Sequence, residues 1–240
     1  MRVALVTGGA VRIGRAIVEE LARRGWAVAF TYRRSEAPAR ELEASILQAG
    51  GDAAALCFGL DDPADRTALV ERLLDRFGGL DALVNNAAVF PRTPLDELDE
   101  ARLREVLAIN LEAPLFLARL LAPTLRARRG AIVNLTDIHA DIPLRHHLAY
   151  TVSKAALAAA TRALAIELAP EVRVNAVAPG AAVFPDGMDE AVRRRIIDRT
   201  LLKRQGGAAE IAGAVRFLLE EAETITGQVL AIDGGRSLVS

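Results

Sequence analysis

Short apolar runs alternate along the chain with longer segments in which apolar residues recur three and four positions apart. The runs predict strands at residues 3–6, 26–31, 53–58, 82–84, 131–135, 172–177 and 228–232. The intervening segments, such as 13–23 and 101–121, have the spacing of amphipathic helices. Because the runs are continuously apolar, we expect parallel strands in a sheet that helices cover on both faces.

The order of these elements predicts an α/β protein with a single doubly wound Rossmann domain over residues 1–240 and a mainly seven-stranded parallel sheet. Ligands of such sheets bind at the carboxyl ends of the strands. An irregular stretch at 179–187 and a helical pattern at 189–199 follow the sixth predicted strand. We expect residues 180–205 to form a lid over a substrate, with an ordinary surface excursion as the alternative.

The first predicted strand leads into a glycine-rich turn at residues 7–14 and then into a helix. Glycine lets the backbone turn tightly and approach a diphosphate, whose charge is stabilised by the helix N-terminus. We therefore expect Gly8, Arg12, Ile13 and Gly14 to contact a dinucleotide.

The second predicted strand ends in Tyr32, followed by Arg33, Arg34 and Ser35, where an NAD-binding protein has an acidic residue for the ribose. Two guanidinium groups and a hydroxyl suit a 2′-phosphate, because arginine pairs with phosphate oxygens in a bidentate fork. The sequence thus predicts NADP as the cofactor. The alternative is that both arginines solvate a loop in an arginine-rich protein.

Tyr150 and Lys154 stand four residues apart at the start of a helical pattern, which puts both side chains on one face. Lysine otherwise occurs only at position 203 in this arginine-rich chain. A nearby ammonium group favours the phenolate, so we expect Lys154 to lower the pKa of Tyr150 and make it a proton donor near neutral pH.

These motifs occur in a specific order: the turn at 7–14, Asn85-Asn86-Ala87-Ala88, Asn110, Tyr150 with Lys154, and Pro179-Gly180. In this order the chain resembles the short-chain dehydrogenases/reductases over essentially its whole length. The resemblance implies that the tyrosine exchanges a proton with the substrate and that the lysine binds the nicotinamide ribose. It also implies that Asn110 supports a water connected to that lysine, and that the protein is a homodimer or homotetramer. The cofactor contacts it implies further along the chain are Leu60, Asn86, Ala87, Pro179 and Gly180.

Three departures from the general family pattern are similar to the pteridine reductases. Asp137 stands thirteen residues before the tyrosine, where the family has serine, and Arg12 replaces the middle glycine of the turn. Phe90 follows the asparagine motif. The resemblance implies that Asp137, Tyr150 and Lys154 form the catalytic set, that Arg12 touches cofactor and substrate, and that Phe90 stacks on a pterin.

Other departures point away from tight recognition of a pterin and its cofactor. Gly59 stands where the family has an aspartate contacting adenine, which leaves backbone contacts near Leu60. Ala88 replaces a serine that is common in pteridine reductases, and Phe184 replaces a threonine that contacts the nicotinamide carboxamide.

The spacing of His139, His146 and His147 matches no zinc site, so no metal is expected. His147 precedes Tyr150 by three residues, and we expect it to line the substrate pocket together with Arg12 and Phe90.

The formal net charge of −1 provides no basic field for nucleic acid or an anionic membrane. The single cysteine, Cys57, cannot form an internal disulfide and is expected as a small core residue of the third strand. No apolar run is as long as a membrane span. We therefore expect a cytoplasmic protein.

The leading hypothesis is an NADPH-dependent reductase that transfers a hydride to a dihydropterin or a folate-like substrate. One alternative is a carbonyl reductase acting on a 3-oxoacyl thioester or another ketone. A second alternative, of another class, is a catalytically idle NADP-binding regulatory protein. The intact set of Tyr150, Lys154 and Asn110 argues against the idle protein, because a pure binder needs no proton donor.

Overall fold

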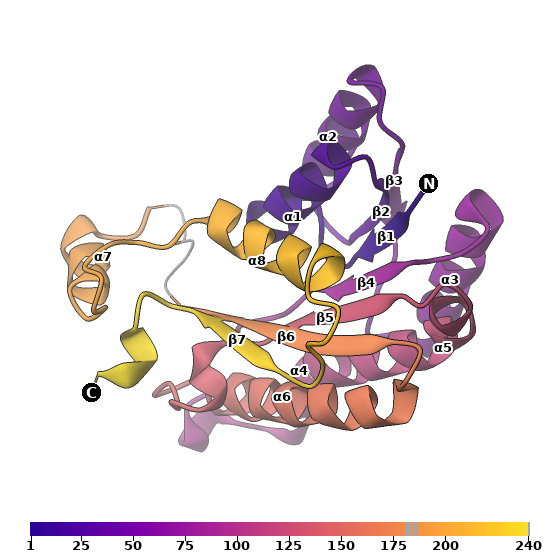
Figure 1. Cartoon of the computed structure of the whole chain (residues 1–240). Helices are drawn as coiled ribbons and strands as arrows, with labels where there is room; N and C mark the ends of the chain where they lie inside the picture. Colours follow the sequence, from indigo (N-terminus) through magenta and orange to yellow (C-terminus); the bar gives the residue numbers. More distant parts are fainter. Residues whose placement is uncertain (181–183, 185–186, 240) are drawn as a thin grey trace.

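The computed structural model describes residues 1–180, 184 and 187–239 (Figure 1). Its strands are β1 (Val3–Val6), β2 (Ala27–Tyr32), β3 (Ala53–Cys57), β4 (Ala82–Asn85), β5 (Ala131–Leu135), β6 (Arg173–Pro179) and β7 (Val229–Ile232). They pair in parallel in one seven-stranded sheet of order β3-β2-β1-β4-β5-β6-β7. The strand order changes direction between β1 and β4, which confirms the predicted doubly wound sheet.

Helices cover both faces of this sheet. They are α1 (Arg12–Arg23), α2 (Glu36–Gln48), α3 (Pro63–Phe77), α4 (Glu100–Leu107), α5 (Ala113–Ala127), α6 (Leu148–Leu168), α7 (Glu190–Ile197) and α8 (Ala208–Glu220). Figure 1 shows α1, α2 and α8 on one face and α3, α5 and α6 on the other.

The two-sided cover explains the continuous apolar strands. Successive strand residues point to opposite faces, so Val6 packs with Ile17 of α1 while its neighbour Leu5 packs with Leu117 of α5. All four residues of β1 and all six of β2 are buried.

A helical stretch of 28 residues, Glu100–Ala127, runs through α4, a π-helical turn (Ala108–Glu112) and α5. By length and mean hydropathy it is the one helix in the described part of the chain that could cross a membrane, which the apolar runs alone did not predict. Leu117 and Leu121 are fully buried in the core on one face of the sheet. It is the core helix of an α/β fold.

The predicted strands agree with the structure to within two residues at each end, with one error of burial. Cys57 ends β3, which is the edge strand of the sheet, and its side chain is exposed. The prediction that it is a core residue is wrong: Ala53 and Ala55, which point to the same face of β3, are buried, whereas Cys57 stands at the end of the strand where this cover stops.

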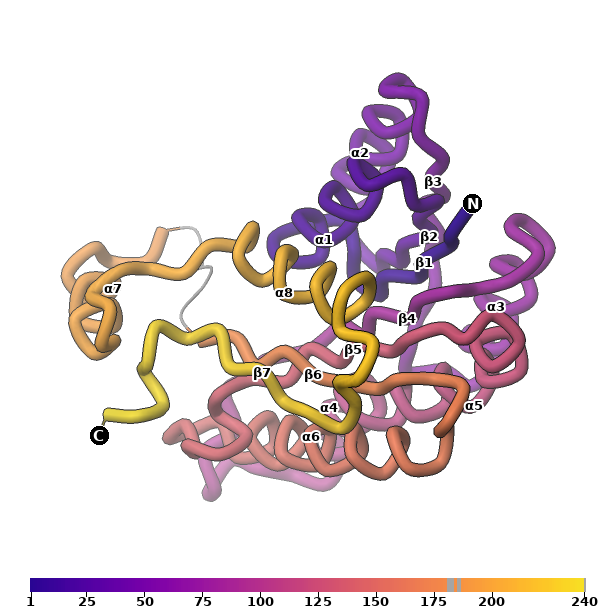
Figure 2. The backbone as a smooth tube through the Cα atoms, viewed as in Figure 1, coloured from indigo at the N-terminus to yellow at the C-terminus, as the bar shows by residue number. Residues whose placement is uncertain are grey.

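The segment predicted as a lid is described in part. Residues 181–183, 185 and 186 lie outside the described residues, and the predicted helix at 189–199 is α7, capped by the Asp189 side chain. The tube view in Figure 2 places α7 near the C-terminus, apart from the helices that cover the sheet. After α7, the Leu202 amide donates to the Gly234 carbonyl at 3.0 Å, so the two segments are joined.

Candidate functional site

The turn after β1 is built for close backbone approach. Gly8 has a φ of +63°, and a Cβ at Gly14 would lie 2.1 Å from the Gly8 carbonyl oxygen. The Gly8 amide donates to the Thr31 hydroxyl at 3.0 Å, which fixes the turn on the end of β2. A side chain at Gly14 would fill this space, so the turn keeps a cradle of backbone groups at the N-terminus of α1.

The segment after β4 is attached to the same turn through Thr7 and Asn86. The Thr7 hydroxyl accepts hydrogen bonds from the amides of Asn86 (2.9 Å) and Ala87 (3.0 Å). In return, the Asn86 side-chain amide donates to the carbonyls of Thr7 (2.9 Å) and Gly8 (3.0 Å). The predicted residues Gly8, Asn86 and Ala87 therefore lie together as one rigid unit.

Arg12 begins α1 with a φ of +55°, in the left-handed region that favours glycine. The sequence places this arginine where the resembling family has a glycine, and the structure gives the same backbone geometry at that position. A non-glycine residue in this region stores strain, which proteins keep at functional positions. The side chain is exposed beside the turn.

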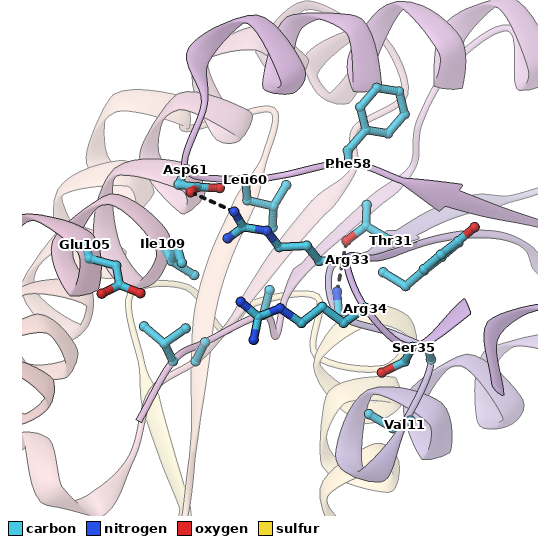
Figure 3. Close-up of a pocket in the computed structure, with 16 residues that line it drawn as sticks. Val11, Thr31, Arg33, Arg34, Ser35, Phe58, Leu60, Asp61, Glu105 and Ile109 are labelled. Carbon is cyan, nitrogen blue, oxygen red and sulfur yellow. Dashed lines mark hydrogen bonds and ion pairs between the residues drawn. The ribbon is translucent and has the colours of Figure 1, made fainter. Parts of the chain in front are cut away.

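A cavity of about 320 Å³ opens beside the turn at the carboxyl ends of β1, β2 and β3 (Figure 3). Its walls come from the turn, the end of β2 with the loop after it, the loop after β3, the segment after β4, and α4 with the π-helical turn. The predicted cofactor residues that line it are Gly8, Arg33, Arg34, Ser35, Leu60 and Ala87. Ile13 instead packs against the core, and Gly14 and Asn86 support the turn from behind.

The cavity also contains residues that sequence reasoning missed. Asp61 and Glu105 place two carboxylates in its wall, and Asp61 Oδ2 lies 3.3 Å from Arg33 Nη2. A Cβ at Gly59 would lie 3.1 Å from Asp61 Oδ1, so this carboxylate stands close to the space that a side chain at position 59 would enter. The only signal in the sequence was the acidic pair Asp61-Asp62 in the loop that follows the third strand.

These features fit a dinucleotide that carries an additional phosphate. The backbone cradle of Gly8 and Gly14 suits a diphosphate, and the cavity beside it has two guanidinium groups and the Ser35 hydroxyl near the N-terminus of α2. The residues present therefore match the group that the turn predicts.

A second cluster lies at the ends of β5 and β6 and at the start of α6. The Tyr150 hydroxyl donates to Asp137 Oδ2 at 2.8 Å. The other carboxylate oxygen, Oδ1, accepts from the His139 amide at 2.8 Å, so both oxygens of Asp137 are held. The structure thus brings together the two residues that were predicted as the proton-transferring pair.

Burial raises the pKa of Tyr150 far above its ordinary value, and the negative charge and hydrogen bond of Asp137 raise it further. The expectation of a lowered pKa is wrong. Desolvation and an acceptor carboxylate both favour the protonated phenol, and they outweigh an ammonium group that lies 5.7 Å from the ring centroid.

Lys154 is buried on the same face of α6, and its Nζ donates to the Leu135 carbonyl at 2.7 Å. Burial lowers the pKa of Lys154 to about 8, against the opposing effect of the Asp137 charge. An ammonium group with one protein hydrogen bond keeps donors for other partners.

Asn110 lies inside the π-helical turn, a feature that often marks functional positions. Its side chain accepts from the Val89 amide (2.9 Å) and donates to the Val89 carbonyl and to Ser153 Oγ (both 3.0 Å). Ser153 Oγ in turn donates to the Tyr150 carbonyl at 2.7 Å. Asn110 therefore ties the segment after β4 to the helix that carries Tyr150, a link that the sequence could not reveal.

Phe90 and His147 complete this cluster. The two rings stack with centroids 4.3 Å apart and planes 7° apart, and the Phe90 and Tyr150 rings are nearly perpendicular with centroids 4.5 Å apart. Phe90 remains 53% exposed, so part of an aromatic surface is open to solvent next to the Tyr150 ring. In the described part of the chain, no three metal-ligating side chains lie together, these histidines included.

Hydrogen bonds hold the Phe90 loop on the start of α6. His147 Nδ1 donates to the Pro91 carbonyl at 3.0 Å, and Thr93 forms a parallel bridge with His147. The Thr93 amide donates to the His146 carbonyl at 2.6 Å, and the Thr93 hydroxyl accepts from the Ala149 amide at 3.2 Å.

The predicted residues Pro179 and Gly180 lie at the carboxyl end of β6 and are not among the residues that line the cavity. Pro179 is the last residue of β6, and the Gly180 amide donates to the Ile232 carbonyl at 3.0 Å. Phe184 stacks under the guanidinium of Arg193 on α7, at 5.4 Å from the ring centroid.

Comparison with known proteins agrees with this arrangement. Residues 9–237 match the profile of the family described as Enoyl-(Acyl carrier protein) reductase. The chain is 34% identical to the dihydromonapterin reductase of Klebsiella pneumoniae over 98% of its length and 96% of that protein. It is 33% identical to the 3-oxoacyl-(acyl-carrier-protein) reductase FabG of Staphylococcus aureus, over 97% and 96% of the two chains.

Solved structures give the same result. The crystal structure of FolM alternative dihydrofolate reductase 1 from Brucella canis, complexed with NADP, superposes with a TM-score of 0.92 at 37% identity and covers 100% of this chain and 95% of its own. The chain is therefore an oxidoreductase of the short-chain dehydrogenase/reductase family, and its relatives include pteridine-reductase-like members.

Proposed function

We propose that the protein is an NADPH-dependent reductase of a dihydropterin or a folate-like substrate. One observation carries this proposal: the Tyr150 hydroxyl is hydrogen-bonded to a carboxylate, Asp137, and the Tyr150 ring contacts the half-exposed ring of Phe90. A heterocycle that must gain a proton at a ring nitrogen needs both an aromatic surface and an acid–base pair. A ketone needs only a proton donor for one oxygen.

The cofactor in this proposal is NADP. Support comes from the guanidinium groups of the cavity and from the Brucella relative that was crystallised with NADP. The turn residues Gly8, Arg12 and Gly14 would hold the diphosphate, and Lys154 the nicotinamide ribose. When bound, the reduced nicotinamide supplies a hydride to a carbon of the substrate.

The residues of this chain supply the matching proton. The Tyr150 hydroxyl is kept protonated by its raised pKa and lies 2.8 Å from the carboxylate that can share its proton. The proton that the ring nitrogen gains leaves from this pair, and solvent then restores it. Phe90 holds the flat ring in place by stacking, a contact worth about 1–3 kcal/mol for planar bases.

A carbonyl reductase is the second candidate. The favouring observation is the 33% identity to a 3-oxoacyl-(acyl-carrier-protein) reductase. In that reaction Tyr150 protonates the developing alkoxide, and Asp137 only holds the Tyr150 hydroxyl in place by accepting its hydrogen bond.

The deciding experiment is a panel of NADPH oxidation assays with a dihydropterin, dihydrofolate and an acetoacetyl thioester. We expect the wild type to reduce the pterin or folate with the higher kcat/KM. Asp137→Asn should lose pterin reduction, while Asp137→Ser should shift the preference toward the thioester. A wild type that ignores every pterin and reduces the ketone well leaves only the general oxidoreductase assignment.

We further propose that α7 and its flanking loops close over the substrate.

We also propose that the protein is cytoplasmic and that it forms a homodimer or homotetramer through α5 and α6. Large apolar side chains on these two helices remain exposed, among them Phe116, Val152 and Ile166. Such residues suit a contact between copies. Light scattering that returns the mass of one chain at assay concentration would contradict the assembly.

A further inference from the structure

An ion pair lies in the wall of the cofactor cavity. Arg33 comes from the loop after β2 and Asp61 from the loop after β3, and Figure 3 shows their side chains pointing toward one another. Arg33 Nη2 lies 3.3 Å from Asp61 Oδ2. Both side chains line the cavity. One of the two guanidinium groups that face the cofactor site is therefore already paired with a carboxylate.

The Asp61 carboxylate is carried by a loop that its neighbours hold in place. The Gly59 amide donates to Asp65 Oδ2 at 2.8 Å, and the buried Arg66 donates to the Leu60 carbonyl at 2.7 Å. Asp62 caps α3 by accepting from the Ala64 amide at 2.8 Å. The backbone that carries Asp61 is thus held on both sides, and Arg33 is the more exposed partner.

Arg34 and Ser35 differ from Arg33 in this respect. Among the described residues, neither the Arg34 guanidinium nor the Ser35 hydroxyl has a hydrogen-bonding or ionic partner. Ser35 occupies the N-cap position of α2, yet its side chain does not cap the helix. An unpaired cation, an uncommitted hydroxyl and a helix N-terminus therefore lie next to one another in the cavity wall.

We propose that Asp61 determines how strongly the protein selects NADP over NAD. By neutralising Arg33 it leaves the 2′-phosphate to Arg34 and Ser35. This inference rests on the proposed cofactor and goes beyond it. It assigns different roles to Arg33 and Arg34, two neighbouring arginines for which the sequence predicted the same contact with the phosphate. The pair as a whole carries no net charge, so it adds little attraction for a phosphate.

The proposal predicts an increase in selectivity from the loss of an acidic residue. Asp61→Asn frees Arg33, which then adds a second guanidinium to the phosphate site. We expect the ratio of Kd for NADH to Kd for NADPH to rise about threefold to tenfold at low salt, the effect of one added charged hydrogen bond. Arg34→Gln should lower the same ratio about tenfold or more.

The double variant Arg33→Gln/Asp61→Asn is the matched control, because it removes the pair without changing the net charge. Its ratio should stay within about threefold of the wild type, as expected for a pair that is neutral toward the phosphate. Glu105→Gln removes the other carboxylate of the cavity, which pairs with Arg102 at 2.6 Å, and should shift the ratio less than Asp61→Asn does. Kd is measured by cofactor fluorescence titration on the folded, full-length protein.

Three outcomes overturn the inference. The first is a ratio unchanged in Asp61→Asn with both affinities lowered equally, as expected if Asp61 only contacts adenine. The second is a double variant that loses selectivity as Arg34→Gln does, and the third is a Glu105→Gln ratio that rises as much as that of Asp61→Asn. If the wild type binds both cofactors equally, the proposed cofactor is wrong, and the role of Asp61 then stands only if Asp61→Asn creates a preference for NADPH.

Discussion

At the scale of single residues, the site is defined by how a carboxylate changes its neighbours. Asp137 accepts a hydrogen bond from the Tyr150 hydroxyl. Its negative charge also raises the pKa of Lys154, against the larger lowering by burial. A serine at that position could make the hydrogen bond without the charge. The hydrogen bond and the charge of Asp137 together keep the Tyr150 phenol protonated and stabilise the buried ammonium group of Lys154.

Tyr150→Phe should lower kcat by a factor of about 10² or more, the usual effect of removing a general acid. Cofactor affinity should change little, because the ring and its contact with Phe90 remain. Steady-state rates and NADPH titration on the same preparation test this. Undiminished turnover would remove Tyr150 from the proton-transfer step.

Lys154 gives a prediction for stability against pH. Its pKa is about 8 in the folded protein and near 10.5 when exposed, so between these pH values the unfolded chain binds more protons than the folded one. The free energy of unfolding of the wild type, relative to Lys154→Met, should therefore rise with pH across this window. The expected gain is up to about 3 kcal/mol, at about 1.4 kcal/mol per pKa unit.

Urea unfolding of wild type and Lys154→Met at pH 7, 9 and 10 measures this difference. Below about pH 8 Lys154 is protonated in both the folded and the unfolded chain, so the free energy of unfolding is lowered by the full cost of burying the charge. If the difference in the free energy of unfolding between the two proteins stays constant from pH 7 to 10, burial does not lower the pKa of Lys154.

At the scale of elements, the site depends on the attachment of the loop after β4 to the start of α6. Thr93, His147 and Asn110 join the two, and His146 takes a φ of +65° in the turn that leads into the helix. The open ring of Phe90 and the Tyr150 hydroxyl are consequently carried by one rigid unit. A flat substrate of the proposed kind, stacked on Phe90, would thereby be held at a fixed distance from the proton donor.

Two substitutions of His147 separate the contacts it makes. His147→Asn can keep the hydrogen bond to the Pro91 carbonyl but loses the ring that backs Phe90, whereas His147→Phe keeps a ring and loses the hydrogen bond. We expect the Asn variant to raise KM for a dihydropterin several-fold, as the loss of about 1 kcal/mol of aromatic contact implies. KM for a small ketone should not change, because no stacking is involved.

Phe90→Leu is the control for this pair. In its background the two His147 variants should have nearly the same KM for the dihydropterin, since the ring they act through is gone. Additive effects in a double-mutant cycle would mean that His147 acts independently of Phe90.

At the scale of the whole molecule, the cavity and the Tyr150 cluster lie on the same edge of the sheet, where the carboxyl ends of the strands meet. The switch in strand order between β1 and β4 opens this edge, and the turn after β1 lies between the two regions. A dinucleotide that spans both regions links segments far apart in the sequence. Its binding should therefore stabilise the whole fold.

NADPH at a hundredfold excess over its Kd should add about 2.7 kcal/mol to the free energy of unfolding. For a chain of this length the expected rise in Tm is about 5–10 °C, at about 2–4 °C per kcal/mol. NADH at the same concentration should raise Tm less. Thermal unfolding with each cofactor measures this, and equal shifts would contradict the preference for NADP.

The sequence by itself determined the sheet, the glycine-rich turn and the pairing of Tyr150 with Lys154. These are local patterns: the spacing of apolar residues reports which faces are buried, and residues four apart on a helix share a face whatever surrounds them. Asp137 is a different case, because its place beside Tyr150 was expected from the family resemblance and not from a local pattern.

Only the tertiary structure decided which charges pair and which groups are desolvated. Arg33 meets Asp61 because β2 and β3 are neighbours at the edge of the sheet, a fact of strand order that no local pattern contains. The direction of the pKa shift of Tyr150 depends on its burial against an acceptor carboxylate. The exposure of Cys57 depends on where the cover of β3 stops, since Ala53 and Ala55 of the same strand are buried. Long-range contacts and solvent access are sums over the whole fold, so they become visible only when every element is in place.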